Sequence, residues 1–213
     1  MMLTFEDLGA QYDAFVFELD DVLFPKKDYL LQVYYLFANL LEYTETVPPA
    51  GELTNFLKTA YQYHGEEGLF ERAAQTFVID EKYREQFRRM HVHAQLPLRL
   101  YLFKDMLTFL QEAVAAGKKI ILLTKGNPLE QLNKVKHLDW QGVDQSLKVY
   151  FYDELYVQGY HSPVEFALKA NDVPLENALL VSKHKEHAYP IMPAGTPVIS
   201  VDLLLSSDAL AEK

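Results

Sequence analysis

The spacing of hydrophobic positions changes along the chain. Residues 14–19, "AFVFEL", form a short apolar and aromatic run that ends in acids, which is typical of a strand buried on both faces. From Asp28, a candidate N-cap, apolar residues recur at helical spacing until "TVPPAG" interrupts them. The pattern therefore predicts a strand followed by an all-helical segment at residues 26–96, with four helices at 28–43, 51–63, 66–78 and 80–94.

After Pro97, helices alternate with short apolar strands. Helices are expected at 103–117, 128–138 and 163–170, and strands at 118–124, 148–153, 178–182 and 196–201. Strands separated by helices of this length imply right-handed crossovers and a parallel sheet with helices on both faces. We predict an α/β fold with a Rossmann-like parallel sheet core at residues 1–25 and 97–213. A four-helix cap at 26–96 is inserted after the first strand.

Composition narrows the function classes. With 213 residues, 49% of them hydrophobic, the chain can bury a sizeable core. Its net charge of -10 argues against nucleic acid or an anionic membrane as partner, because phosphate binding needs a basic surface. The chain has no cysteine, which excludes disulfides, thiol nucleophiles and cysteine-ligated metals. We read no export signal at the N-terminus and no apolar run long enough to cross a bilayer, so a cytoplasmic location is expected.

Polar residues gather at the predicted strand ends, where open parallel sheets bind ligands. The first strand ends at Glu18, Asp20 and Asp21, and "TKGNP" begins at Thr124. The segments "YHSP" at 160–163 and "SKHKEH" at 182–187 are two further polar segments of this kind, and we call the four segments the stations. Taken alone, "FELDD" is also compatible with a polar strand terminus followed by a turn.

In this order around a helical insertion, the four stations resemble the motifs of the haloacid dehalogenase-like (HAD) hydrolases of the helical-cap type, which are mostly phosphatases. In "FVFELDDVL", Glu18 stands where that family has its nucleophilic Asp, and Asp20 stands at the general acid–base position. In "IILLTKGNP", Thr124 matches the residue that hydrogen-bonds the phosphoryl group. The resemblance covers nearly the whole chain.

Other motif positions differ from that family. His161, or Tyr160 with the alternative spacing, replaces the lysine that steadies nucleophile and phosphate. Ser182, Lys183 and His187 occupy the places of the motif that holds Mg²⁺. The resemblance thus implies a catalytic set of Glu18, Asp20 and Thr124 and ligand-binding positions at Asp21, Lys125, Gly126, His161 and Lys183. No metal site is predicted, since Mg²⁺, the family's cofactor, lacks its acidic ligands.

Three functions follow from these substitutions. The first is a protein that has lost Mg²⁺-dependent phosphatase activity and binds a small anionic or phosphorylated molecule, or a protein partner. The second is a metal-independent hydrolase that uses Glu18 and Asp20. The third is an oligomerisation module formed by the cap helices, with the chain a monomer or homodimer. Lys183 is either a fixed cation directed at Glu18 and Asp20 in place of the metal or an ordinary solvated lysine.

Overall fold

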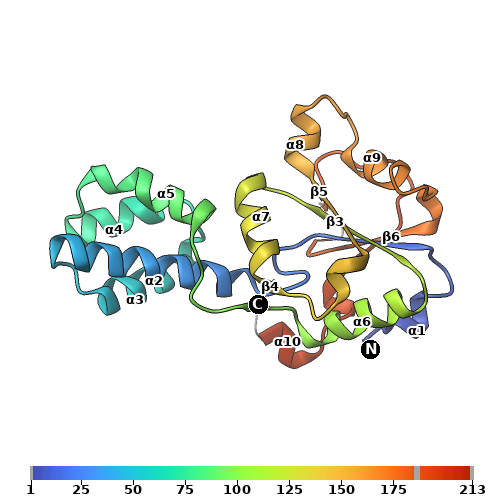
Figure 1. Cartoon of the computed structure of the whole chain (residues 1–213), viewed down its shortest axis with the longest axis horizontal. Coiled ribbons are helices and arrows are strands. Elements are labelled where there is room, and N and C mark those ends of the chain that lie inside the picture. The colour runs from blue at the N-terminus through green and yellow to red at the C-terminus, as the bar shows by residue number, and fades with distance from the viewer. Residues whose placement is uncertain (1, 185–187, 212–213) are drawn as a thin grey trace. The chain divides into compact units, whose positions relative to one another are not determined.

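The chain divides into two compact units. The computed structural model describes residues 2–184 and 188–211. One unit contains Met1–Lys26 and Leu100–Lys213, and the other contains Lys27–Arg99 (Figure 1). The predicted core and cap meet at residues 25/26 and 96/97, close to the junctions of these two units at 26/27 and 99/100. We describe each unit by itself.

The first unit is built on a five-stranded parallel sheet. The strand order is β5-β3-β1-β6-β7, which places the first strand in the centre. The strands are β1 (Ala14–Phe17), β3 (Lys119–Thr124), β5 (Leu147–Phe151), β6 (Ala178–Ser182) and β7 (Val198–Ser200). The predicted α/β class with a Rossmann-like parallel sheet is confirmed. The carboxyl ends of β1, β3 and β6, where ligands bind in such sheets, lie next to one another.

Helices cover both faces of this sheet (Figure 1). Because side chains alternate along a strand, Ala14 and Val16 face one side, where they share a core with α8 (Tyr152–Val157) and α9 (Pro163–Lys169). Phe15 and Phe17 face the other side, where their rings lie 5.0 and 6.0 Å from the ring of Phe109. Phe109 belongs to α6 (Lys104–Ala115), which packs there with α1 (Phe5–Leu8). The alternation explains why β1 is apolar throughout.

A tight turn follows β1. The N–H of Leu23 donates to the carbonyl of Leu19 at 3.0 Å, and Asp21 takes a positive φ of 58°. The Asp21 carboxylate then accepts a hydrogen bond from the N–H of Lys26 at 3.0 Å. This bond satisfies one of the free N–H groups at a helix start, so α2 (Lys26–Glu45) begins at Lys26. The prediction of Asp28 as its N-cap was therefore wrong.

The second unit contains most of α2 together with α3 (Ala50–His64), α4 (Leu69–Phe77), a 3-10 turn η1 (Glu81–Tyr83) and α5 (Arg84–His93). Its core is aromatic: the ring of Phe87 lies 4.8 Å from Phe37 and stacks on Tyr34 at 6.1 Å. The predicted helix 80–94 is instead a 3-10 turn plus an α-helix, because the Asp80 side chain accepts a bond from the Lys82 N–H. In the described part of the chain, no helix is long and apolar enough to cross a membrane.

Some elements differ from the prediction. The strand expected to reach Asp153 stops at Phe151, and α8, which was not predicted, follows at once because Tyr152 is buried against Tyr189. Two-residue strands leave no periodic pattern, so the small parallel sheet of β2 (Leu100–Tyr101) and β4 (Leu138–Asp139) was also missed. The remaining elements are α7 (Pro128–His137), η2 (Val143–Ser146), η3 (Leu175–Asn177), η5 (Val201–Leu203) and α10 (Ser207–Ala211).

Candidate functional site

Glu18 lies at the carboxyl end of β1, with one carboxylate oxygen hydrogen-bonded and the other in an ion pair. Parallel pairing of β1 with β6, extended by the bond from the Glu18 N–H to the Val181 carbonyl, brings Glu18 beside Ser182. Oε2 accepts the Ser182 hydroxyl and, at 3.1 Å, the backbone N–H of Lys183. Oε1 lies 2.7 Å from the Lys125 ammonium, which also donates to the Ala188 carbonyl. The residue is only 7% exposed, so its negative charge is neutralised within the protein.

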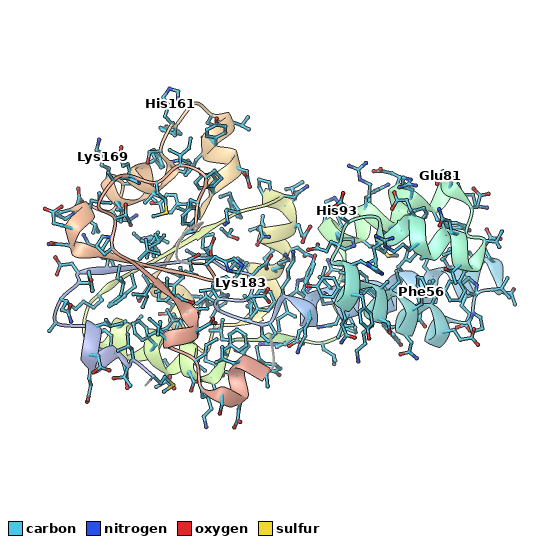
Figure 2. The ribbon with its side chains drawn as sticks, turned by 180° about the vertical axis from the view of Figure 1, so that it is seen from behind. Phe56, Glu81, His93, His161, Lys169 and Lys183 are labelled. Carbon is cyan, nitrogen blue, oxygen red and sulfur yellow. The ribbon has the colours of Figure 1, made fainter. Side chains whose placement is uncertain are left out.

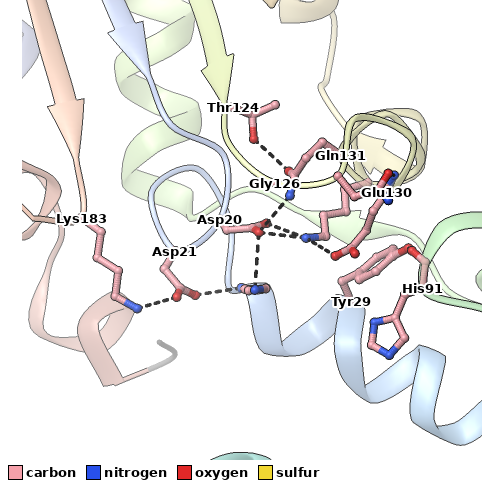
Figure 3. A network of polar contacts seen from close by, with 12 residues as sticks. Asp20, Asp21, Tyr29, His91, Thr124, Gly126, Glu130, Gln131 and Lys183 are labelled. Atoms are coloured by element: carbon pink, nitrogen blue, oxygen red, sulfur yellow. Dashed lines mark hydrogen bonds and ion pairs between the residues drawn. The ribbon is translucent and has the colours of Figure 1, made fainter. Parts of the chain in front are cut away.

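Asp20 is held by a buried lysine. Its carboxylate accepts Lys134 Nζ at 2.8 and 3.1 Å and Gln131 Nε2 at 3.2 Å (Figure 3). Lys134 has a fully buried side chain and also pairs with Glu130 at 2.8 Å. Asn127 caps α7 by accepting from its first N–H groups, and Gln131 and Lys134, three residues apart, therefore project from one face of that helix.

Asp21 binds the third lysine. Lys183 Nζ lies 2.7 Å from Asp21 Oδ2, and the Lys183 side chain is 44% exposed (Figure 3). The hypothesis that this ammonium is directed at Glu18 and Asp20 is therefore wrong. The Lys183 residue reaches Glu18 through its backbone N–H, because the side chain leaves the end of β6 toward the turn after β1. The three carboxylates at the end of β1 and in the turn after it thus each pair with a different lysine, and Asp20 has a second one, Lys26, at 3.9 Å.

The donors expected to face an anion are used inside the chain. Thr124, at the end of β3, is 2% exposed, and its hydroxyl donates to Gln131 Oε1 at 2.8 Å. Gln131 in turn donates through Nε2 to the Asp20 carboxylate. Thr124 therefore supports Asp20 through Gln131, and its hydroxyl is not free to donate to a ligand. The Gly126 N–H, in a backbone conformation with φ of 100°, donates to Asp153 Oδ2 at 2.5 Å.

Comparison with known proteins identifies the fold. No protein-family model and no curated protein matches the sequence. Among solved structures, a beta-phosphoglucomutase-like protein from Thermotoga maritima is similar over 94% of this chain and 99% of that chain, with a TM-score of 0.51 and 16% sequence identity. The chain has the haloacid dehalogenase-like fold.

Two further similar structures bear family names. The L-2-haloacid dehalogenase PA0810 matches with a TM-score of 0.48 and 18% identity, over 82% of this chain and 77% of that one. A HAD family hydrolase from Deinococcus radiodurans R1, solved with bound phosphate and sodium, matches with a TM-score of 0.46 and 14% identity, over 92% of this chain and 98% of that one. The HAD-like fold accounts for the position of the polar residues at the strand ends.

The structure brings most of the predicted site residues together but not His161. Glu18, Asp20, Asp21 and Thr124 lie at adjacent strand ends, and Lys125, Gly126 and Lys183 follow those strands directly. His161 is exposed and lies at the outer edge of the unit, apart from Lys183 (Figure 2). It therefore lies apart from the residues gathered at the strand ends, and its ligand-binding role stays a prediction. His187 lies outside the described residues.

Mg²⁺, the cation expected with this fold, does not fit the donors present. Its octahedral shell needs free oxygen ligands at about 2.0–2.1 Å. One Glu18 oxygen already accepts a hydroxyl and an N–H, the other pairs with an ammonium, and the sequence has Lys183 where the resemblance leads us to expect an acid. An ammonium such as that of Lys125 repels a cation about 4 Å away by roughly 4 kcal/mol at an effective dielectric of 20. Lysines neutralise these carboxylates instead: Lys125 pairs with Glu18, and Lys134 and Lys26 pair with Asp20.

Lys134, Gln131 and Asp153 belong to this network and were missed from the sequence. Glu130 and Lys134 are four residues apart on a helix, a spacing that normally marks a solvent-exposed pair. Gln131 has no pattern of its own. One usable indication was available: α7 follows the predicted phosphate-binding strand at once, so polar residues in its first two turns lie close to the strand end. Asp153 was assigned to a strand and not to the start of α8.

Tyr189 is a buried residue that lies against Lys125 of this site. Its hydroxyl donates to the Leu123 carbonyl, its ring stacks on Tyr152 at 5.1 Å, and the Lys125 ammonium lies 5.3 Å from the ring centre. Burial raises the pKa of Tyr189 well above its ordinary value, and the negative charge of Glu18 raises this pKa further. Because the folded-state pKa exceeds the unfolded one, the resulting stability is present below about pH 10 and is lost as the pH rises above that value.

We therefore expect Tyr189→Phe to flatten the alkaline loss of stability. At neutral pH the variant should be less stable by about 1–3 kcal/mol, since the Leu123 carbonyl loses its donor. The deficit should shrink as the pH is raised above about 10, where only the parent must bury an ionising phenol. Urea unfolding across this range measures both effects. The exposed Tyr160, changed to Phe, is the control, and parallel pH profiles for parent and Tyr189→Phe would contradict the assignment.

Proposed function

We propose that this protein with the HAD-like fold has lost Mg²⁺-dependent phosphatase activity and works as a binding module. The observation that supports this most is the pairing of Glu18 with Lys125, Ser182 and the Lys183 N–H. Phosphoryl transfer through an acyl phosphate needs a carboxylate oxygen in line with phosphorus and a cation for the developing charge. Here the oxygens are engaged internally and the cations are lysines.

The position of Glu18 argues the same way. Its side chain is one methylene longer than that of the Asp that the resemblance leads us to expect, which advances the carboxylate by roughly 1 Å, and a misplacement of about 1 Å costs on the order of a hundredfold in rate. A metal-independent route through Asp20 would need a free oxygen to take a proton from water. Both Asp20 oxygens accept Lys134, and one also accepts Gln131.

Among binding roles, a protein partner fits better than a small anion. A phosphate would need the Thr124 hydroxyl and the Gly126 N–H, but these donate to Gln131 and Asp153. Each of Lys125 and Lys183 is already paired with a carboxylate. An anion would have to displace these internal acceptors, which weakens its binding by the cost of leaving carboxylates unpaired.

A phosphate-ester assay tests the loss of activity. We expect the purified protein to hydrolyse p-nitrophenyl phosphate at the same background rate with and without Mg²⁺, and no faster than its Glu18→Gln and Asp20→Asn variants. Circular dichroism should confirm that both variants are folded, because Asp20 anchors the buried Lys134. Turnover by the parent that either folded variant abolishes would refute the proposal and favour a working hydrolase.

A further inference from the structure

A groove of about 900 Å³ lies within the helical unit. It is formed by the second half of α2, the turn η1 and α5. This groove is lined by residues of Lys27–Arg99 alone and shares no residue with the site at the strand ends. None of the proposed chemistry uses it. Its volume is in the range that proteins use to bind ligands or inserted side chains.

The α2 side of the groove is apolar. Leu36, Leu40 and Tyr43 recur at i, i+4 and i+7, so they form one stripe along the helix. Leu36 and Leu40 are only partly buried, and Tyr43 is 90% exposed. Met90 of α5 adds a flexible apolar side chain to the lining. A partly exposed apolar stripe of this kind is suited to covering by another apolar surface.

The opposite side is basic. Lys82, Arg89 and His93 are exposed and follow one another along η1 and α5, with Arg89 and His93 four residues apart on one helix face (Figure 2). Lys82 already pairs with Glu45 at 2.8 Å, so Arg89 is the cation of this edge that a carboxylate of a partner would meet. Arg89 forms no ion pair with any residue that the structure describes. The one acid in the lining, Glu85, lies 3.8 Å from Arg88 outside it. A basic edge is unusual for a chain with a net charge of -10.

We propose that this groove binds an acidic amphipathic helix of a partner protein. An apolar stripe beside a basic edge is complementary to a helix that has leucine-like residues on one face and carboxylates next to it. From Leu36 to Tyr43 the stripe spans about 10 Å at 1.5 Å per residue, which matches anchors at i, i+4 and i+7 of the incoming helix. The inference deepens the proposed binding function, on which it rests, by naming the partner class.

Two labelled peptides test this directly on the full chain. The probe is an amphipathic peptide with leucines at i, i+4 and i+7 and glutamates flanking them, and its partner has lysines in place of the glutamates. By fluorescence anisotropy we expect the acidic peptide to bind at least about tenfold more tightly than the basic one, because like charges at the edge repel. Equal binding of the two peptides, or no binding of the acidic one up to about 1 mM, would overturn the proposal.

Adjacent arginines supply a matched pair of variants. Arg89→Glu, inside the lining, should weaken the acidic peptide by about tenfold and improve the basic one, whereas Arg88→Glu, outside it, should change either by less than about twofold. Leu40→Glu should also weaken binding. Equal effects of the two arginine variants would refute the site.

Dodecanoate, added as a competitor of the peptide, tests whether the groove binds a small amphiphile instead of a helix. Failure to displace the peptide supports a helix-binding groove, and displacement at concentrations below the peptide's own dissociation constant would overturn it in favour of a small amphiphile. The phosphate-ester assay is independent of these measurements. Loss of peptide binding with no enzymatic turnover would therefore reject this groove alone, and turnover would reject the proposed function alone.

Discussion

Lys134→Met is expected to lower the melting temperature of the protein by about 6–12 °C. Lys134 is the fully buried cation that Asp20 and Glu130 share. Removing one partner of a buried ion pair costs about 3–5 kcal/mol, because the remaining charges lose their compensation. Asp20 and Glu130 keep side-chain exposures of 23% and 17%, so we take about 3 kcal/mol, and each kcal/mol shifts the melting temperature of a chain of this size by about 2–4 °C.

Lys136→Met is the matched control for this experiment. It removes the same charge from the same helix, but Lys136 is exposed, so a change within about 1 °C is expected. Differential scanning calorimetry of both variants measures the contrast. Equal melting temperatures for the two variants would mean that Lys134 does not form its ion pair with Asp20 in solution. The assignment of Lys134 as the charge that compensates Asp20 would then be wrong.

The part of the fold that determines the site could be predicted because it depends on local apolar runs. Residues 14–19, 118–124 and 178–182 are apolar enough to be read as buried strands, and parallel pairing brings their ends together. Glu18 and Thr124 could therefore be placed next to the same edge of the sheet from sequence. Their partners could not, since these depend on side-chain direction.

Lys134 and Lys183 illustrate this limit. A lysine's ammonium sits on a long flexible stem, so its position is set by whichever carboxylate the tertiary structure offers. Glu130 and Lys134 look like an ordinary surface pair until α7 packs against the turn that carries Asp20. Lys183 was expected near Glu18 and in fact binds Asp21, because the positive φ of Asp21 turns that carboxylate toward the end of β6. The periodicity of the sequence does not show which carboxylate a lysine will bind.

The double variant Glu18→Asp with Lys183→Asp is expected to gain Mg²⁺ binding that the parent lacks. The first change withdraws the carboxylate by one methylene from Lys125, and the second replaces an ammonium by a carboxylate at the residue whose N–H contacts Glu18. Two acids then share one position, and a divalent cation relieves their repulsion. Mg²⁺ at a hundred times its dissociation constant stabilises a folded protein by about 2.7 kcal/mol, which corresponds to about 5–11 °C.

Thermal melting with and without Mg²⁺ measures this gain, and Glu18→Asp with Lys183→Asn is its control. The control removes the same ammonium without adding a carboxylate, so it should show no Mg²⁺ response. Both variants lose the Lys183–Asp21 pair, so this loss cancels when their Mg²⁺ responses are compared. If the folded double variant ignores Mg²⁺, Lys183 does not stand at the position of the metal-holding acid. If Mg²⁺ raises the melting temperature of the parent as much as that of the double variant, the native donors accept the ion. Mg²⁺ would then have displaced Lys125 from Glu18.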